Sequence, residues 1–253
     1  MSIKLSHDIL EPYTINGTII TTLTNSGYLM YTLNMLKSLK PYGLDKKIFI
    51  TCIDKKGSEG LKKMGYDSYC VDETVGNPLG KFCPWNSTDY VKICYYKLEL
   101  IYNILLYRNV LLIDGDIVFK KNPIDDLKQW CNDTIFDVFC QNDSLNNSNT
   151  RNMCTGYMFI KKSDRLLKLY DCVSEVGRSK YLKCAFDNND QTYFNVYVKP
   201  YCMCNALPLE KYPNGKMFYD NPTLDPVLVH FNWVQGHLKM EKMKEHGMWL
   251  LTD

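Results

Sequence analysis

The feature that most constrains the fold is an uninterrupted apolar run that leads into two aspartates. In "NVLLIDGD" (109–116) the apolar residues are consecutive and do not alternate with polar ones. Consecutive apolar residues are typical of a strand that is covered on both faces, as in the middle of a parallel sheet. Asp114 and Asp116 would then lie at the carboxyl end of a central strand, the edge at which open α/β sheets bind ligands.

The residues before this run predict strands and helices in alternation. β-Branched and apolar segments indicate strands, and apolar residues at helical spacing indicate helices. Strands are expected at 17–24, 46–54 and 67–72, and helices at 27–43, 58–66 and 88–107. Since parallel strands are joined by crossover connections that are usually helical, this order predicts an α/β fold with a mostly parallel central sheet and flanking helices.

The second half of the chain has a more mixed pattern. Strands are expected at 136–141, 154–162 and 225–233, helices at 163–179 and 238–247, and a turn followed by a helix or strand at 187–199. No internal repeat and no low-complexity linker interrupts the 253 residues. The sequence therefore predicts a single domain over 1–253.

Composition narrows the environment and the partners. The net charge of +2 comes without a basic stripe, so no nucleic-acid partner is expected. The 11 cysteines are scattered and odd in number, which favours reduced thiols in a reducing compartment. No segment has the apolar core of a signal peptide or the length of a membrane span. A cytoplasmic protein without a membrane span is the resulting expectation.

Two aspartates one residue apart after a buried strand suit one divalent cation. Gly115 between them gives the backbone room to turn and lets a ligand approach closely. Mg²⁺ and Mn²⁺ favour carboxylate and phosphate oxygens. Such a site would hold the diphosphate of a nucleotide sugar and neutralise the charge that grows on it as it leaves.

Two other interpretations of the motif stay open at this point. An Asp-x-Asp match arises by chance in a chain of this length, and it then marks only a solvated turn. Haloacid-dehalogenase-type phosphatases also carry Asp-x-Asp after a buried strand, but in their first strand and with a later lysine and acidic pair. Here about a hundred residues come first, and the only adjacent acidic pair downstream, Asp125-Asp126, lies close behind Asp116.

With these segments taken together, the chain resembles GT-A-fold, metal-dependent glycosyltransferases of the nucleotide-diphospho-sugar transferase family. The resemblance holds in order and spacing over about 17–250, and is carried by "TTLTNSGYLMYTLNMLKSL" (21–39), "YYKLELIYNILLYRNVLLIDGDIVFKKNP" (95–123), "CTGYMFIKKSD" (154–164) and "VHFNWVQGHLKMEKMKEHGMW" (229–249). It implies a Rossmann-like GT-A domain with a nucleotide-binding half at about 17–123. The sugar and acceptor half would occupy about 124–253.

The resemblance also implies roles by position. The residues expected at the nucleotide and its diphosphate are Thr22, Thr24, Asn25, Tyr28, Lys97, Asp114, Gly115, Gly236 and Lys239. Asp114, Asp116 and His230 would hold Mn²⁺ or Mg²⁺, since neutral imidazole is a competent ligand for Mn²⁺. Ordinary alternatives remain for single residues: strand pairing for the threonines, a solvated charge for Lys97 and a hydrogen-bonded core position for His230.

The sugar site is expected on the second half. Thr155 and Gly156 fit the family's sugar strand, but Cys154 stands where some relatives have asparagine, and a thiol is a weak donor. Asp190 and Gln191 resemble the pair that lines the sugar in retaining transferases and are the expected catalytic residues. The alternative for "DNNDQ" (187–191) is a helix N-cap. Gln141 and Asp143, which follow a predicted strand, are expected on the acceptor side.

The sequence thus predicts a transferase that moves a sugar from a nucleoside-diphosphate sugar, expected to be a UDP-sugar, to a glycan or glycoprotein acceptor with retention. A bacterial or viral enzyme is favoured, in the host cytoplasm if viral. The rival is a catalytically inactive glycosyltransferase-like protein that binds nucleotide or glycan. A sugar nucleotidylyltransferase would need a Gly-rich basic loop after the first strand, and "TLTNSGY" (22–28) is not one. The oligomeric state is left open.

Overall fold

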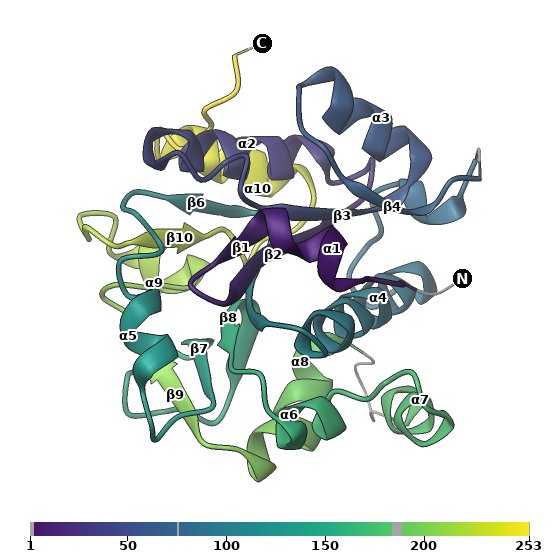
Figure 1. Cartoon of the computed structure of the whole chain (residues 1–253). Helices are drawn as coiled ribbons and strands as arrows, with labels where there is room; N and C mark the ends of the chain where they lie inside the picture. Colours follow the sequence, from purple (N-terminus) through teal and green to yellow (C-terminus); the bar gives the residue numbers. More distant parts are fainter. Residues whose placement is uncertain (1–2, 75, 184–188, 253) are drawn as a thin grey trace.

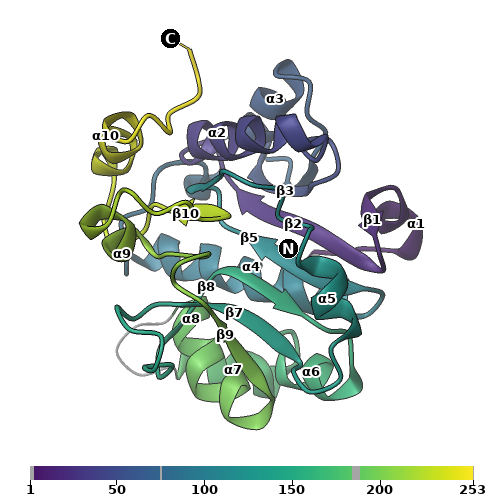
Figure 2. The same ribbon diagram turned by 90° about the vertical axis from the view of Figure 1, so that its left-hand side faces the viewer.

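The computed structural model of the chain describes residues 3–74, 76–183 and 189–252. Its centre is a mixed sheet whose strands lie in the order β4 (Tyr69–Asp72), β3 (Phe49–Asp54), β2 (Thr18–Thr24), β5 (Asn109–Ile113), β8 (Met153–Ile160), β7 (Val138–Asn142) and β9 (Cys204–Leu207). Strand β8 runs antiparallel to β5 and β7, and the other neighbours along this order are parallel (Figure 2). The short β1 (Thr14–Ile15) pairs with β2. The expected mostly parallel α/β sheet is confirmed.

The first half follows the alternation that the sequence predicts. Helices α2 (Leu29–Leu39) and α3 (Lys55–Lys63) pack on one face of the sheet, and α4 (Thr88–Leu105) packs on the other (Figure 1). Along β5, Val110 and Leu112 belong to the core on the α4 side, and Leu111 and Ile113 belong to the core on the α2 side. Both faces of β5 are therefore covered, which explains its run of consecutive apolar residues.

A second, two-stranded sheet places a segment near the C-terminus beside the carboxyl end of β5. Strand β6 (Ile117–Phe119) pairs antiparallel with β10 (Leu228–His230), and His230 lies opposite Ile117. Helices α9 (Gly215–Asp220) and α10 (His237–Glu245) pack on it through a core that contains Phe218 and Met243. This pairing places His230 beside the Asp-Gly-Asp turn, although 114 to 230 is a long separation in sequence.

Two sequence predictions need correction in this half, and a third, which left two alternatives open, is decided. The expected helix at 163–179 is two helices, α6 (Asp164–Leu169) and α7 (Glu175–Leu182), because Ser174 caps a new helix by accepting from the backbone of Gly177. The strand expected at 225–233 is only the three residues of β10. Of the helix or strand expected in 187–199, the described part is the helix. There α8 (Asp190–Tyr193) is continued by a π-helical turn at Phe194–Val198, and 187 and 188 lie outside the described residues.

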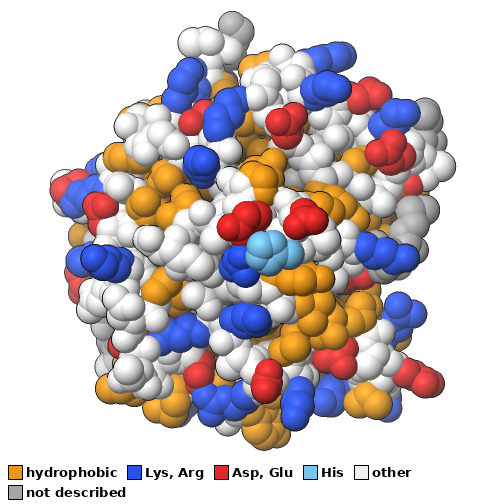
Figure 3. Space-filling view, viewed as in Figure 1, with side chains coloured by type: hydrophobic (Ala, Val, Ile, Leu, Met, Phe, Trp, Pro, Cys, Tyr) orange, Lys and Arg blue, Asp and Glu red, His pale blue; other side chains and the backbone are white. Residues whose placement is uncertain are grey.

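The remaining elements are short. They are α1 (His7–Leu10), α5 (Leu127–Asn132) and the 3₁₀ turns Glu11–Tyr13, Lys40–Tyr42, Pro78–Gly80 and Lys199–Tyr201. Within the described ranges, no helix is both long and apolar enough to cross a membrane. On the face shown in Figure 3, Lys and Arg are interspersed with Asp and Glu, in keeping with the near-neutral net charge.

Candidate active site

A cavity of about 770 Å³ opens at the carboxyl ends of β2 and β5. Its walls come from the start of α2, the inner face of α4, the turn between β5 and β6, strand β8, the start of α8 and the segment that follows β10. The volume lies within the usual range of ligand pockets. Its place is the strand edge at which α/β sheets bind ligands.

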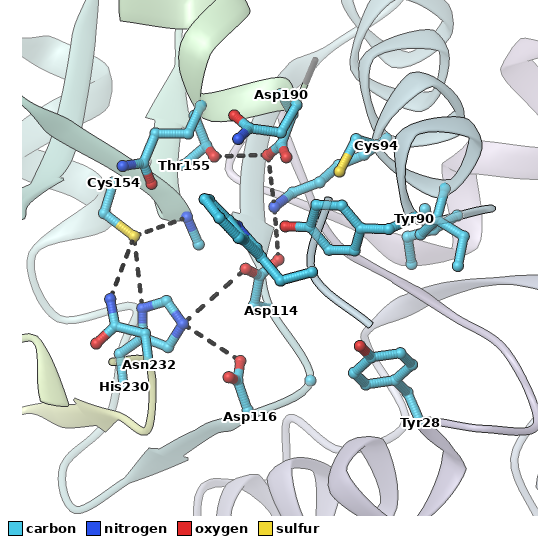
Figure 4. Close-up of a pocket in the computed structure, with 18 of the residues that line it drawn as sticks. Tyr28, Tyr90, Cys94, Asp114, Asp116, Cys154, Thr155, Asp190, His230 and Asn232 are labelled. Atoms are coloured by element: carbon cyan, nitrogen blue, oxygen red, sulfur yellow. Dashed lines mark hydrogen bonds and ion pairs between the residues drawn. The ribbon is translucent and has the colours of Figure 1, made fainter. Parts of the chain in front are cut away.

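Asp114, Asp116 and His230 converge on one point of this cavity (Figure 4). Nε2 of His230 lies 3.2 Å from Oδ1 of Asp116 and 4.0 Å from Oδ2 of Asp114. One ligand atom from each of the three side chains lies within 4.8 Å of the others. Two carboxylates and an imidazole form a donor set that suits Mn²⁺ and, less well, Mg²⁺. The three residues that the sequence proposes as metal ligands are thus together.

The tautomer of His230 is fixed by Gln141, which is fully buried at the end of β7. The Gln141 amide nitrogen donates to the carbonyls of Tyr212 at 3.2 Å and Pro213 at 2.8 Å. Its oxygen must therefore face Nδ1 of His230, 2.7 Å away, and accept the proton there. With the Nδ1 proton bound to Gln141, Nε2 is the ring nitrogen that faces the two aspartates, and the neutral ring would offer its lone pair to a metal there.

Lys97 links two carboxylates inside the cavity. Its Nζ lies 2.7 Å from Oδ1 of Asp114 and 2.8 Å from Oδ2 of Asp190, and the side chain of Lys97 is buried on α4. Burial by itself would lower the pKa of Lys97, but the two carboxylates outweigh it and raise the pKa well above its usual value. Lys97 is therefore charged at neutral pH and is not a solvated surface lysine.

Asp190 is held on two sides at the start of α8. Burial alone would raise the pKa of Asp190, yet Lys97 and a hydrogen bond from Thr155 Oγ1, at 2.5 Å, lower it. Asn189, the residue before it, caps α8 by accepting from the backbone of Thr192. The sequence alternative of an N-cap is thus true of Asn189, while Asp190 itself faces the cavity.

Lys239 places a second positive charge in the cavity, beside the candidate metal ligands. Its ammonium group pairs with Oδ2 of Asp116. Burial would raise the pKa of Asp116, but Lys239 and His230 together hold it well below its ordinary value. Lys239 lies on α10, whose N-cap Gly236 has φ 56° and ψ −137°, a conformation that residues with a Cβ avoid. The Tyr31 hydroxyl donates to the Gly236 carbonyl at 2.9 Å, which ties this segment to α2.

Gly156 lets β8 pass directly against the acidic cluster. Its carbonyl accepts from the backbone of Asp114 at 2.7 Å. A Cβ at this position would overlap the His230 ring and the Asp114 carboxylate. Glycine is therefore required here by close packing, which the Thr-Gly pattern of the sequence anticipated only as a family feature.

Most residues singled out from the sequence line this one cavity. They are Thr24, Asn25, Tyr28, Lys97, Asp114, Gly115, Asp116, Asp143, Thr155, Gly156, Asp190, Gln191, His230, Gly236 and Lys239. Asn25 lines it without a free amide, because its nitrogen donates to the carbonyls of Leu79 and Lys81 and its oxygen accepts from the backbone of Tyr28. Asn25 therefore shapes the wall of the cavity and fixes the start of α2.

Two expectations about direct ligand contact are corrected. Thr22 is fully buried and does not line the cavity, because it lies two residues before Thr24 on the same face of β2, one strand repeat deeper in the sheet. Gln141 was expected at the acceptor, but it is buried behind His230 and holds that ring instead. Of the two acceptor-side candidates, only Asp143 reaches the cavity.

Cys154, on β8, faces His230 of the Asp114-Asp116-His230 cluster. Its Sγ is 3.6 Å from Nδ1 of His230 and 3.8 Å from Nδ2 of Asn232, and the backbone of Gly156 donates to it at 3.4 Å (Figure 4). Burial raises the pKa of the Cys154 thiol well above its usual value, so it stays neutral. The thiol thus packs against the imidazole instead of offering a strong hydrogen bond to a sugar.

Several lining residues were not singled out from the sequence: Phe82, Trp85, Tyr90, Cys94, Asn152 and Asn195. Cys94 precedes Lys97 by one helical turn, so the 3.6-residue period could have found it. Asn152 and Asn195 carry no such local signal. Asn232 and Trp233 also line the cavity, and they belong to the 229–249 segment that carries the family resemblance, which by itself gives them no role.

The fold is that of the GT-A glycosyltransferases. The structure superposes on a glycosyltransferase involved in the glycosylation of the major capsid of PBCV-1 with a TM-score of 0.55 and 13% identity, covering 91% of this chain and 99% of that one. The bifunctional glycosyltransferase WbbM gives a TM-score of 0.59 with 13% identity, over 94% of this chain and 50% of the other. At these identities the likeness concerns the fold.

The sequence identifies the family. The chain belongs to the nucleotide-diphospho-sugar transferases, whose family model matches residues 43–245. A curated relative from Dictyostelium discoideum, UDP-galactose:fucoside alpha-3-galactosyltransferase, is 23% identical over 292 residues. The alignment covers 92% of this chain and 43% of the relative, so the chain spans less than half the length of that protein.

Proposed function

We propose that this chain transfers a sugar from a nucleoside-diphosphate sugar to a glycan or glycoprotein acceptor, with Mn²⁺ or Mg²⁺ as cofactor. The observation that carries the proposal is the convergence of Asp114, Asp116 and the Nε2 of His230 in a cavity of nucleotide-sugar size. Family membership supports the donor class. The name of the Dictyostelium relative makes UDP-galactose the first donor to test.

The proposed division of labour follows the two halves of the chain. Residues of about 17–123, with Thr24 and Tyr28 in the cavity wall, would bind the nucleoside, and residues of about 124–253 would bind the sugar and acceptor. The ring of Tyr28 lies 5.1 Å from that of Phe82, which supports an aromatic nucleoside wall. Thr155 and Asp190 form the opposite wall, beyond β5.

In the proposed mechanism, the chain supplies charge on both sides of the bond that breaks. A bound divalent cation would neutralise the departing diphosphate. Lys239 and Lys97 are the cations that the chain itself places in the cavity, and both would attract phosphate oxygens. Asp190, kept ionised by Lys97 and Thr155, would stabilise the positive charge that grows on the sugar. Gln191 would contact the sugar beside it.

Retention is proposed to follow a front-side path. The acceptor oxygen forms a bond to the anomeric carbon on the face from which the diphosphate leaves, the bond from that carbon to the phosphate oxygen breaks, and the acceptor proton moves to the leaving phosphate. Gln191 supports this path because an amide is a poor nucleophile. The Gln191 amide nitrogen donates to Oδ2 of Asp143 at 3.0 Å, and this hydrogen bond fixes the amide at the cavity wall.

Nucleotide release tests the proposal. The purified chain is incubated with Mn²⁺ and a panel of UDP-, GDP-, TDP- and CMP-sugars, with and without simple glycosides as acceptors. Release of one nucleotide is expected, together with its loss in EDTA and in Asp116→Asn. The exposed Asp125, outside the cavity, gives the matched control Asp125→Asn, which should keep the activity. Release that persists in EDTA or in Asp116→Asn would contradict the metal role.

A protein that binds nucleotide without turnover is the second candidate. Two observations favour a binding protein. Lys239 already pairs with the carboxylate of Asp116, and the neutral thiol of Cys154 stands where some relatives have the stronger hydrogen-bond donor asparagine. The same assay separates the candidates when UDP binding is measured in parallel by calorimetry. Metal-dependent UDP binding without release in the presence of any acceptor would favour the binding protein.

A further inference from the structure

Trp233 is a large aromatic residue in an unusual backbone conformation at the cavity. It lines the cavity with 55% of its surface exposed, and its φ is +64°. Bulky residues rarely adopt a left-handed backbone, and such conformations persist where the surroundings enforce them, commonly at ligand sites. Both the exposure and the conformation are unfavourable for the protein alone, so they call for a function.

The surroundings of Trp233 enforce its position through the preceding residue. The Asn232 side-chain oxygen accepts from the backbone of Gly215 at 2.6 Å, and the Asn232 carbonyl accepts from the Tyr219 hydroxyl at 3.1 Å. The backbone that carries the indole is thereby anchored to α9. A ligand that stacks on this ring would lose little free energy in ordering it.

The polar edge of the indole is already satisfied by the protein. Its Nε1 donates to Oδ1 of Asp143 at 3.1 Å. Oδ2 of the same carboxylate accepts from Gln191 at 3.0 Å and from Asn152 at 3.1 Å. Since the single N–H of the ring is used, the exposed part of Trp233 offers apolar ring surface to the cavity.

This surface lies at the end of the cavity away from the nucleoside wall. Tyr28 follows the carboxyl end of β2, and Asp143 follows the carboxyl end of β7. Strands β5 and β8 lie between β2 and β7 in the sheet, so the two residues are at opposite ends of the cavity. The amides of Asn152 and Gln191 line the cavity beside the indole. An apolar ring next to fixed amides suits a molecule with one apolar face and a polar rim.

We propose that Trp233, held by Asp143, is the acceptor subsite and takes a pyranose ring of the acceptor glycan. A pyranose presents C–H groups on a face, which pack on an aromatic ring, and hydroxyl groups around its rim, which the neighbouring amides can bind. The inference rests on the proposed function and deepens it, because it assigns the acceptor class and the surface that selects it. Asp143 is a positioning residue for the ring.

The test measures acceptor binding without turnover. Saturation-transfer NMR is recorded on methyl glycosides (α-L-fucoside, β-D-galactoside, β-D-glucoside and β-D-xyloside) with the full chain, the diamagnetic Mg²⁺ and UDP. UDP affinity is measured by calorimetry on the same samples. The variants are Trp233→Ala, Trp233→Phe and Asp143→Ala. Tyr201, an aromatic residue that is 64% exposed and outside the cavity, gives the control Tyr201→Ala.

The expected result is transfer to the ring C–H protons of at least one glycoside in the wild type. Its affinity falls about tenfold or more in Trp233→Ala. The glycoside affinity falls less in Trp233→Phe, which keeps an aromatic face. The affinity of Asp143→Ala lies between those of Trp233→Ala and Trp233→Phe. Tyr201→Ala keeps the affinity, and UDP affinity is equal in all variants, which also shows that they are folded.

Three outcomes would overturn the inference. Equal glycoside affinity in Trp233→Ala and the wild type excludes the ring as a platform. A wild type that binds UDP but no glycoside also excludes the subsite. Loss of UDP affinity in Trp233→Ala, with folding intact by circular dichroism, would place the indole at the nucleotide. A wild type that binds no nucleotide of the donor panel contradicts the proposed function itself, and that outcome is distinct from the other three.

Discussion

The Gln141 side-chain oxygen lies 2.7 Å from Nδ1 of His230, and the Gln141 nitrogen donates to two backbone carbonyls. A buried amide thus determines which nitrogen of a candidate metal ligand carries its lone pair. The relation joins β7 to β10, which are not neighbours in either sheet. The candidate metal site would thus depend on a residue that lies behind His230 and does not line the cavity.

The first prediction concerns this amide. Gln141→Leu should weaken Mn²⁺ binding by about 10- to 100-fold, because Nδ1 loses its acceptor and the imidazole is free to change tautomer and orientation. Mn²⁺ affinity is measured by electron paramagnetic resonance on the full chain. The exposed Gln129 on α5 provides the control Gln129→Leu. Unchanged Mn²⁺ affinity in Gln141→Leu would show that the hydrogen bond has no role in the site.

The second prediction concerns Lys97. Lys97→Met keeps an unbranched side chain but removes the ammonium group, which leaves Asp114 and Asp190 without their shared cation in a buried site. The free energy of unfolding should therefore fall by about 3–5 kcal/mol. Urea denaturation followed by circular dichroism measures the change.

The same helix offers the control for Lys97. Lys92 is exposed and pairs with Asp89 at 3.4 Å on the surface, so Lys92→Met should cost about 1 kcal/mol or less. Equal losses in the two variants would mean that Lys97 contributes no more than a surface ion pair.

The third prediction is a pH dependence. Burial raises the pKa of Glu99 on α4, whose Oε1 accepts from the backbone of Ile3 at 3.0 Å while Oε2 is buried without a hydrogen-bond partner among the described residues. The folded protein therefore holds this proton more tightly than the unfolded chain. Stability from this group is complete below the unfolded pKa of about 4.3 and is lost as the pH rises through the higher folded pKa.

Glu99→Gln should remove the loss of stability that deprotonation of Glu99 causes as the pH rises. The unfolding free energy of the variant minus that of the wild type should increase between about pH 4.5 and pH 7, as measured by urea denaturation at several pH values. Glu59→Gln, at an exposed position on α3, controls for the change of charge. A difference for Glu99→Gln that stays constant with pH would mean that the buried carboxyl does not titrate as described.

The sequence could predict the parts of the fold and site that depend on local pattern. The consecutive apolar residues of β5 indicate a strand that is buried on both faces. Asp114 is the residue directly after this strand, so its place at the sheet edge could be predicted as well. The role of Gln141 could not be predicted, because it depends on carbonyls of Tyr212 and Pro213 about seventy residues away and on the ring of His230.

The break in the expected helix at 163–179 has a similar tertiary cause. Tyr170 and Cys172 are fully buried in the core shared with α4, and the chain turns there before Ser174 starts a new helix. The apolar pattern of this segment is compatible with one helix, and only packing against other elements decides against it. The short length of β10 also depends on tertiary packing, because its partner strand β6 is more than a hundred residues away.

The last prediction concerns the metal and stability. If Asp114, Asp116 and His230 hold a divalent cation in the folded chain, Mn²⁺ at a hundredfold excess over its Kd should raise the free energy of unfolding by about 2.7 kcal/mol, because the unfolded chain lacks the site. Thermal unfolding with and without Mn²⁺ measures the shift, and EDTA should reverse it. Lys239 pairs with Oδ2 of Asp116, next to the Oδ1 that faces His230, so its positive charge would oppose a cation bound there. Lys239→Met should therefore bind Mn²⁺ more tightly than the wild type, whereas His230→Ala should lose the shift. A stabilisation that survives in His230→Ala would place the metal elsewhere on the chain.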